Sequence, residues 1–311
     1  MVAAVRRVGM ALRVGLGVAL FALSISTALS QEHDVASIAR TKARLLLAGV
    51  ERWGCQYQNV DLDRIAGSDL DLIVIDPVLD GGTGRNIDHQ HIKTLQRKPD
   101  GSRRLVFAYL SIGAAEEYRA YWQADWQNKP PTWLGASSPD WLRSHAVQFW
   151  QPDWQRIAAE GLQRIVAAGF DGVFLDRVDA YQDWKELRPS ALEDMADLVI
   201  QLSQSARKSA PGFLVIGQNA EHLLAEPRYR EVIDAVSKES LLTGLQGQGV
   251  SNSMDQISWS MPYLLMAQES GLTVLVIEYL DDSPENDAVR QRHRIMRFRP
   301  FLAKRLLDRL P

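Results

Sequence analysis

Acidic side chains follow apolar segments at several places in this sequence. In the stretch GFDGVFLDRVDAY, residues 169–181, the apolar run from Val173 to Leu175 leads directly to Asp176, and Asp179 follows. An apolar strand has no structural need to end on a carboxylate, so this pattern indicates chemistry. The residues that end comparable apolar runs elsewhere are Asp76, Tyr109, Asn219, Glu239, Glu278 and Tyr279.

The spacing of these residues predicts that they share one edge of a sheet. Alternate residues of a strand point to the same face, so Phe174 and Asp176 share one face, as do Val276 and Glu278. In a barrel of parallel strands this places the carboxylates at the C-terminal mouth, where the active sites of such barrels lie. Several like charges around one mouth repel each other, so the pattern favours a functional site.

A group of carboxylates with aromatic rings and an amide is typical of glycoside hydrolysis. That reaction needs one protonated carboxyl group to give a proton to the leaving oxygen. It also needs one ionised carboxylate to attack the anomeric carbon or to activate a water molecule. Crowded carboxylates push each other's pKa values apart, which supplies both forms at one pH.

Other hydrolytic chemistries find less support in the sequence. His89 and His91 form the only closely spaced histidine pair, but they fall at a predicted helix start and not at a strand end. We therefore expect no metal and no other cofactor. A G-x-S-x-G nucleophile elbow and a phosphate-binding loop are both absent.

The elements that must position these groups alternate between short apolar runs and amphipathic helices. Helices are expected over residues 154–169, 190–209 and 253–271, the last with Pro262 inside it. Strands are expected over residues 53–58, 70–76, 104–110, 170–176, 213–219, 233–239, 272–279 and 298–303.

Eight such strand–helix units predict a (β/α)8 TIM barrel. The main alternative is a doubly wound open sheet, which normally uses fewer strands. No dinucleotide fingerprint follows the first strand, and we interpret the glycine-rich GLQGQG at 244–249 as a loop.

A long connection from Ser111 to Asp153 follows the third predicted strand. Loops of this length inside a compact domain are usually functional. We expect two of the rings in and beside it to be platforms for a sugar and the others to pack as a small core. The tryptophans concerned are Trp122, Trp126, Trp133, Trp141, Trp150 and Trp154.

The N-terminal thirty residues resemble a secretory signal peptide, with a retained anchor as the alternative. Arg6, Arg7 and Arg13 precede the apolar stretch 14–25, and small residues after that stretch predict a cleavage site after Ser30. We expect residues 31–311 to form a single barrel domain that is secreted or periplasmic. Cys55 is the only cysteine, and we interpret it as a buried small residue.

The charge of the chain bears on its partners. The formal net charge of −3 becomes about −6 once the three arginines of residues 1–30 are removed. A mildly acidic exported protein is a poor candidate for binding nucleic acid or, after signal cleavage, a membrane. The charge is compatible with a neutral or cationic substrate.

Five sequence blocks resemble glycoside hydrolase family 114, barrel proteins typified by endo-α-1,4-polygalactosaminidase. The resemblance runs from about Trp53 to residue 310. The blocks are AYLSIGAAEEYRAYW (108–122), WQPDWQ (150–155), GFDGVFLDRVDAYQDW (169–184), IGQNAEHLL (216–224) and VIEYL (276–280).

The resemblance implies an exported enzyme that cuts α-1,4-linked galactosamine, a cationic polymer. It points to Asp176 as nucleophile or charge stabiliser and to Glu239 as general acid/base, with Glu278 as the alternative partner. Arg119 is expected to anchor the long loop. The residues expected to shape the sugar subsite are Asp76, Tyr109, Asp179, Tyr181, Asn219 and Tyr279.

One departure from the family pattern keeps other functions open. Relatives tend to read GEAEDYR where this chain has GAAEEYR, so Ala114 replaces a glutamate. A barrel of the same family that binds carbohydrate without cleaving it is therefore an alternative. An exported metal-dependent deacetylase is a third hypothesis, for which the sequence shows no ligand set.

Overall fold

The computed structural model describes residues 35–79, 84–139 and 141–310, so the expected signal segment 1–30 lies outside the described residues. Eight parallel strands form the main sheet. Their bounds are β1 (Trp53–Gln56), β2 (Leu72–Ile75), β3 (Leu105–Ser111), β7 (Gly172–Asp176), β8 (Leu214–Gln218), β9 (Ala235–Glu239), β10 (Thr273–Glu278) and β11 (Arg299–Leu302).

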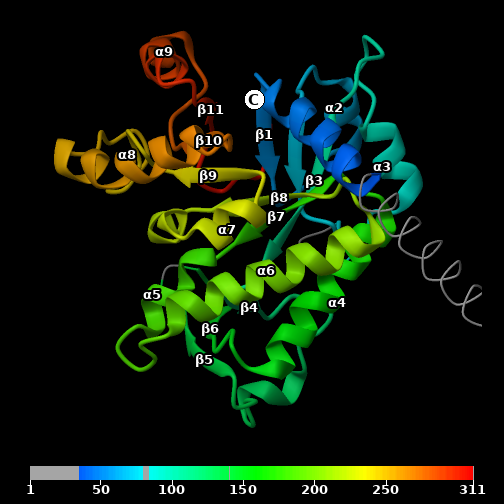
Figure 1. The fold of residues 1–311 in the computed structure, drawn as a ribbon, viewed down its shortest axis with the longest axis vertical. Coiled ribbons are helices and arrows are strands. Elements are labelled where there is room, and N and C mark those ends of the chain that lie inside the picture. Colours follow the sequence, from blue (N-terminus) through cyan, green and yellow to red (C-terminus); the bar gives the residue numbers. More distant parts are fainter. Residues whose placement is uncertain (1–34, 80–83, 140, 311) are drawn as a thin grey trace, which may run out of the picture.

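The strands follow the order β1-β2-β3-β7-β8-β9-β10-β11, and the last strand returns to the first. The Trp53 indole Nε1–H donates to the Arg299 carbonyl at 2.8 Å, and the Trp53 ring lies 5.6 Å from the Phe301 ring. This contact nearly closes the sheet, and helices lie around it (Figure 1). The predicted (β/α)8 barrel is confirmed, and the doubly wound sheet is rejected.

The helices alternate with the strands. Pro152 begins α4, and Gly169 ends it with a left-handed φ of 86°, as its sequence predicts. A capping box between Ser253 and Gln256 begins α8, which continues through Pro262. The helices are α2 (Leu62–Gly67), α3 (His89–Leu95), α4 (Pro152–Ala168), α5 (Tyr181–Trp184), α6 (Ala191–Ser209), α7 (Pro227–Val232), α8 (Met254–Glu269) and α9 (Asp287–Ile295), and residues 35–48 are also helical.

Two apolar layers flank the strands. Phe107, Phe174 and Leu275 belong to the layer inside the barrel, which also holds the fully buried Cys55. The neighbouring strand residues, such as Val106, pack in the layer between the strands and the helices. Whether a strand-end side chain faces the mouth therefore depends on a single residue of alternation.

The long connection after β3 contains a second sheet, which the sequence did not predict. Its order is β4-β6-β5, and both pairings are antiparallel. Each strand has only three or four residues, too few for an alternating pattern to stand out. Their bounds are β4 (Ala114–Glu116), β5 (Leu134–Ser137) and β6 (Ser144–Val147), with the 3-10 helix η1 (Ala124–Gln127) between β4 and β5.

Several tryptophans form the small core expected for this connection. Trp126 and Trp133 are buried with ring centroids 5.0 Å apart, and Trp133 lies 5.1 Å from the buried Trp154. Trp141 differs from these, because it is 47% exposed. The Arg305 guanidinium lies 5.9 Å from its ring and 5.3 Å from the ring of Tyr279.

Asp171 directly precedes β7 and is held by several partners. Its carboxylate accepts from the Val106 N–H at 2.9 Å and from Gln96 Nε2 at 3.2 Å, and it pairs with Arg103. The side chain is only 16% exposed. Asp171 therefore joins β3 and the end of α3 to β7, which is a structural role.

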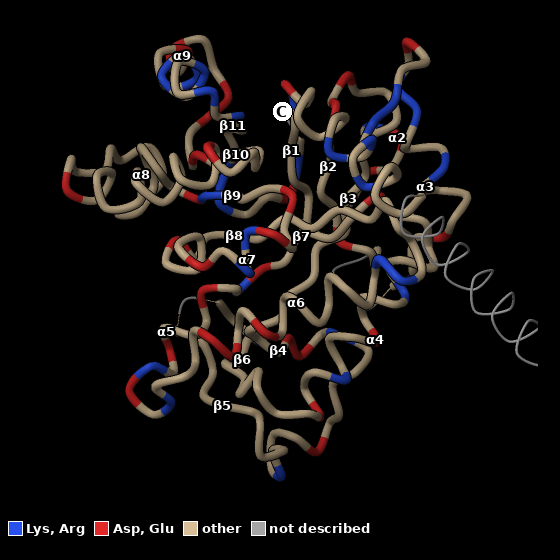
Figure 2. The backbone as a smooth tube through the Cα atoms, viewed as in Figure 1, with Lys and Arg blue, Asp and Glu red and all other residues tan. Residues whose placement is uncertain are grey.

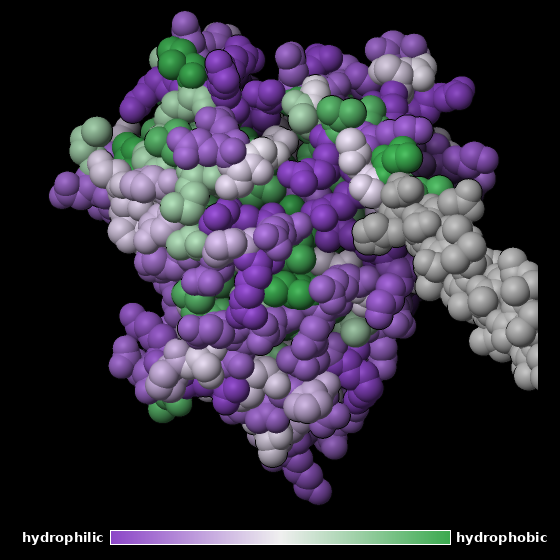
Figure 3. All heavy atoms as spheres, in the orientation of Figure 1, coloured by the Kyte–Doolittle hydropathy of each residue, from purple (hydrophilic) through white to green (hydrophobic). Residues whose placement is uncertain are grey.

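The surface is mainly polar. Many charged residues lie on the helices and loops (Figure 2), while patches of apolar residues show between them (Figure 3). Within the part of the chain that the structure describes, no helix has the length and apolar character needed to cross a membrane.

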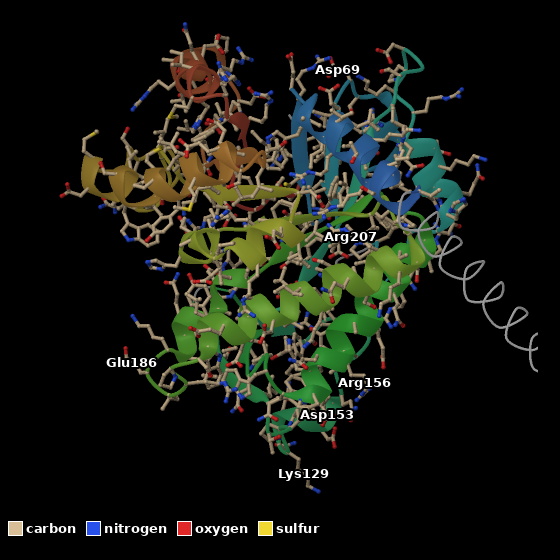
Figure 4. All side chains as sticks on the ribbon, viewed as in Figure 1. Asp69, Lys129, Asp153, Arg156, Glu186 and Arg207 are labelled. Atoms are coloured by element: carbon tan, nitrogen blue, oxygen red, sulfur yellow. The ribbon has the colours of Figure 1, made fainter. Side chains whose placement is uncertain are left out.

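A buried ion pair fastens the helices to the end of the barrel opposite the mouth. Arg207 of α6, labelled in Figure 4, donates to Asp234 Oδ2 at 2.7 Å. Arg40 donates to Oδ1 of the same carboxylate at 3.0 Å, and the Val215 N–H donates to Oδ2 at 2.8 Å. Asp234 is 1% exposed, so its carboxylate has a structural role.

Candidate active site

A set of polar residues faces inward at the carboxyl ends of the strands. Each of them follows a buried inward-facing residue by two positions, as Tyr109 follows Phe107, Asp176 follows Phe174 and Glu239 follows Ser237. By this alternation, the residues directed to the barrel mouth are Tyr57, Asp76, Tyr109, Asp176, Gln218, Glu239 and Tyr279.

Asp176 is held by a tyrosine from the neighbouring strand. The Tyr109 hydroxyl donates to Asp176 Oδ2 at 2.6 Å and lies 3.4 Å from Glu116 Oε1. The ring of Tyr57 packs against the Tyr109 ring with centroids 4.6 Å apart. These contacts fix the orientation of the Asp176 carboxyl group.

The environment of Asp176 changes its acidity. Asp176 keeps a partly exposed edge, yet burial raises the pKa of its carboxyl group to about 7. The negative charge of Glu239 adds to this rise, and the hydrogen bond from Tyr109 opposes it. Asp176 can therefore exchange a proton near neutral pH.

Glu239 has its own tyrosine and amide partners. The Tyr279 hydroxyl donates to Glu239 Oε1, and Asn219 Nδ2 lies 3.4 Å from Oε2. The Glu239 N–H donates to Asn219 Oδ1 at 3.0 Å. Asn219 and Ala220 adopt left-handed φ angles of 54° and 58°, which turn the chain after β8 so that Asn219 can reach Glu239. Glu239 is partly exposed, like Asp176.

Arg119 joins the long connection to the barrel, as predicted. It donates to Asp76 Oδ1 at 2.8 Å and to Glu116 Oε2 at 2.7 Å. Burial raises the pKa of Asp76, and the positive charge of Arg119 opposes that rise. Both carboxylates are buried and paired, so they serve to shape the mouth and lie out of reach of a substrate.

The carboxylates of the mouth thus fall into two groups. Asp76 and Glu116 are buried against Arg119, whereas Asp176 and Glu239 are partly exposed. Among the residues that the structure describes, neither Asp176 nor Glu239 forms an ion pair with a cationic side chain. The structure therefore brings together a reachable carboxyl pair on β7 and β9, separated by β8.

The expectation that Glu278 faces the mouth is wrong. Val274 and Val276 pack in the outer layer, so the alternation directs Glu278 outward and Tyr279 inward. Glu278 is fully buried and accepts from the Leu242 N–H, the Thr243 N–H and hydroxyl, and pairs with His293 Nε2, each at 2.8 Å. Its carboxylate fixes the loop after β9 and is not accessible to a sugar.

Two residues beyond β7 occupy different environments. Asp179 lies on the 3-10 helix η2 (Val178–Ala180), and its side chain is 29% exposed. Burial raises the pKa of Asp179, against the charge of Arg177. Tyr181 is only 5% exposed and packs in the outer layer, so the expectation that it lines the sugar subsite is wrong.

The sequence interpretation missed three residues of the mouth. Gln218 ends β8 and was passed over for Asn219, its neighbour. Its Oε1 atom is buried and finds no hydrogen-bond partner within residues 35–79, 84–139 and 141–310. Glu116 ends the short strand β4 and Tyr57 directly follows β1. Only Tyr57 could have been found from the sequence, since it alternates with Cys55.

A cavity of about 570 Å³ lies beside this cluster. Tyr109, Glu116 and Arg119 form one side of it, and its remaining lining continues between β3 and α4. That lining is mainly apolar, with Ile157 and Phe170 among its residues, so it does not suit the hydroxyl groups of a sugar.

The described residues contain no group of three or more His, Cys, Asp and Glu side chains arranged to hold a metal ion. His91 Nδ1 lies 2.6 Å from Asp88 Oδ1 at the start of α3. That contact belongs to the cap of the helix, because the same Asp88 oxygen accepts from the His91 N–H.

Comparison with known proteins gives the family of the chain. The family model for glycoside-hydrolase family GH114 matches residues 35–310. The chain belongs to family GH114. A protein of Deinococcus radiodurans, an uncharacterized protein, is 34% identical over 267 residues, which cover 85% of this chain and 83% of the relative. The uncharacterized protein MJ1477 of Methanocaldococcus jannaschii is 33% identical over 239 residues, covering 76% and 68%.

Two solved structures of GH114-like fold are similar to this one. The glycoside hydrolase domain of PelA from Pseudomonas aeruginosa has a TM-score of 0.68 and 22% identity, covering 84% of this chain and 98% of that domain. Aspergillus fumigatus Ega3, solved in complex with galactosamine, has a TM-score of 0.60 and 19% identity, covering 85% and 94%. At these identities the likeness extends to the fold.

Proposed function

We propose that this GH114 protein hydrolyses α-1,4-linked galactosamine polymers with Asp176 and Glu239 as its carboxyl pair. One observation chiefly supports the proposal. These two carboxyl groups are partly exposed at the mouth, whereas Asp76 and Glu116 are buried in ion pairs with Arg119. Each member of the pair also accepts a hydrogen bond from a tyrosine hydroxyl, Asp176 from Tyr109 and Glu239 from Tyr279.

We assign the roles of the pair from the family resemblance. Glu239 acts as general acid/base, giving a proton to the leaving oxygen and, in the second half of the reaction, taking one from water. Asp176 acts ionised, as nucleophile or as stabiliser of the positive charge that develops on the sugar. Tyr109 orients the Asp176 carboxylate, and its hydrogen bond favours the ionised form of Asp176.

A cationic amino sugar suits the acidic mouth. The charge of Glu239 raises the pKa of both Asp176 and Asp179, and the charge of Asp179 adds to the rise at Asp176. An ammonium group brought close to them would offset this repulsion. The presence of galactosamine in the complex of Ega3 supports the same class of substrate.

The place of action is a further part of the proposal. The basic and apolar pattern of residues 1–30 supports export, and a secreted or periplasmic enzyme would meet an extracellular polysaccharide. N-terminal sequencing of the exported protein tests this, with Gln31 expected as the first residue.

The catalytic proposal is tested by replacing Asp176→Asn and Glu239→Gln and assaying α-1,4-linked galactosamine oligomers for new reducing ends. Each change is expected to lower kcat by at least about 100-fold, as removal of a general acid or a nucleophile does. A matched control is Glu160→Gln on the exposed face of α4, which should cleave at the normal rate. Cleavage at the wild-type rate by both site variants would contradict the assignment.

Ala114 favours a second candidate function, a barrel that binds the polymer without cutting it. Ala114 lies on β4 and is 4% exposed, where the family pattern has a glutamate. In that case the oligomers would bind saturably and no new reducing ends would form at any enzyme concentration. Because Asp176 and Glu239 are both present and partly exposed, we favour hydrolysis.

A further inference from the structure

A second group of aromatic rings lies outside the mouth, on the η3 (Glu221–Ala225) and α8 segments. The His222 ring lies 5.2 Å from the Trp259 ring and 5.4 Å from the Tyr263 ring, and it meets both nearly edge-on. Trp259 is 46% exposed, and His222 is exposed as well. We call these three residues the outer aromatic cluster.

A buried bridge fastens this cluster to the strand that carries Glu239. Glu221 Oε1 lies 2.9 Å from Lys238 Nζ and accepts from the Ser260 hydroxyl at 2.8 Å. Glu221 is only 3% exposed. Each member of the bridge is next in sequence to a residue of interest: Lys238 to Glu239, Glu221 to His222, and Ser260 to Trp259. The position of the cluster relative to Glu239 is therefore fixed.

The segment after β7 borders the same region. The positive charge of Lys238 lowers the pKa of Asp179, and Tyr263 lies near enough to Tyr181 to influence its hydroxyl. Asp179, whose side chain is 29% exposed, thus lies near both Asp176 and Lys238.

The exposure of these rings has no explanation in the packing of the barrel. A large aromatic side chain that only filled space would be buried, as Trp154 is at 1%. Figure 3 shows pale and green residues over α8. Because α8 begins at the mouth end of the barrel, its first turns place Trp259 beside the rim.

We propose that the outer aromatic cluster is a second binding platform, on which a glycan chain rests several sugar units away from the bond that is cut. This rests on the proposed function, because the chain is the substrate held at Asp176 and Glu239. Aromatic rings present flat apolar faces to the C–H faces of sugars. They also attract ammonium groups such as those of galactosamine. A chain held at Asp176 and Glu239 would pass Asp179 before it reached Trp259.

The platform is tested with Trp259→Ala, assayed on long α-1,4-linked galactosamine oligomers and on the shortest ones that the protein cleaves. The variant is expected to raise KM for long oligomers about tenfold with kcat unchanged, and to alter KM for the shortest ones less than twofold. Trp259→Phe should restore most of the affinity for long oligomers. Met254→Ala, at the start of α8 and outside the outer aromatic cluster, is the control and should behave like the wild type with both lengths.

Two results would overturn the platform. An equal loss for short and long oligomers would assign Trp259 a structural role, and no loss for either would leave the rings without a role in binding. Binding to the inactive Asp176→Asn variant, measured by calorimetry with and without Trp259→Ala, separates this inference from the proposed function. Binding that depends on Trp259 would support the platform whether or not the wild type cleaves, whereas absence of new reducing ends with the wild type would contradict the hydrolase alone.

Discussion

The Tyr109 hydroxyl donates a hydrogen bond of 2.6 Å to Asp176 Oδ2 and so couples β3 to the central carboxyl group of the mouth. This bond lowers the pKa of Asp176, against burial and the charge of Glu239, which together raise it to about 7. The acidity of Asp176 is therefore set by a tyrosine that can be changed without altering the charge of the site.

Replacing Tyr109→Phe is expected to move the pH dependence of the reaction. Because Asp176 acts ionised, kcat/KM should rise with pH through about 7 in the wild type. Loss of the hydrogen bond destabilises the ionised form of Asp176, so the rise of kcat/KM should move to a pH about one unit higher. A rate that instead falls through this range would make Asp176 the general acid.

Asp176→Asn should stabilise the protein at neutral pH. The pKa of Asp176 is raised from 3.8 in the unfolded chain to about 7 in the folded one, so its ionisation disfavours folding as pH rises from about 4 to 7. The variant should gain up to about 4 kcal/mol of unfolding free energy at pH 7 and above, and nothing below pH 4. Urea denaturation at both pH values measures this, and a gain that is the same at both would be inconsistent with it.

Glu278→Gln and Glu239→Gln should have opposite effects. The buried Glu278 accepts several hydrogen bonds, so its change should cost about 2–4 kcal/mol of stability and leave kcat of the folded protein near normal. Glu239→Gln should lower kcat while the denaturation midpoint stays almost constant. A catalytic loss from Glu278→Gln without loss of stability would place the second carboxyl group on β10.

Arg119→Ala should destabilise the mouth by about 3–5 kcal/mol, because it leaves Asp76 and Glu116 buried without a partner. The loss should shrink in acid, where both carboxyl groups are protonated. Arg119→Lys keeps the charge but cannot donate in two directions with fixed geometry, so an intermediate loss is expected. Equal stability of all three proteins in urea at pH 7 would mean that Arg119 does not join the two segments.

Cys55 should resist alkylation in the folded protein. It is fully buried in the barrel interior, and burial raises the pKa of its thiol well above the usual value. Mass spectrometry after iodoacetamide treatment should show no label in the native state and complete label in guanidinium chloride. Rapid labelling without denaturant would show that the barrel opens.

The sequence predicted the order and place of all eight strands, because each is a short apolar run between amphipathic helices. It did not predict which side chains at the ends face the mouth. The segment LTVLVIEY is apolar on both faces, as buried parallel strands are, so nothing in it distinguishes Glu278 from Tyr279. For the same reason the sequence interpretation chose Asn219 in place of its neighbour Gln218. In both strands a shift of one residue decides which side chain faces the mouth.

Long-range partners were a second limit. That Arg119 anchors the long connection followed from its location, but its two partners lie on different segments, and Asp76 is 43 residues away. The small sheet β4-β6-β5 escaped detection because its strands are short and its pairing depends on the packed tryptophans beneath it. Such contacts are set by the folded geometry and leave no periodic pattern in the chain.

The closing contact between Trp53 and Arg299 joins residues 246 positions apart. Until the last strand has been made, β1 is an edge strand with unpaired backbone groups along one side, and the interior that holds Cys55 stays open there. A ribosome must therefore release almost the whole chain before its first strand is protected. The newly made protein should therefore depend on chaperones for longer than a domain whose first strand finds all its partners early in the sequence.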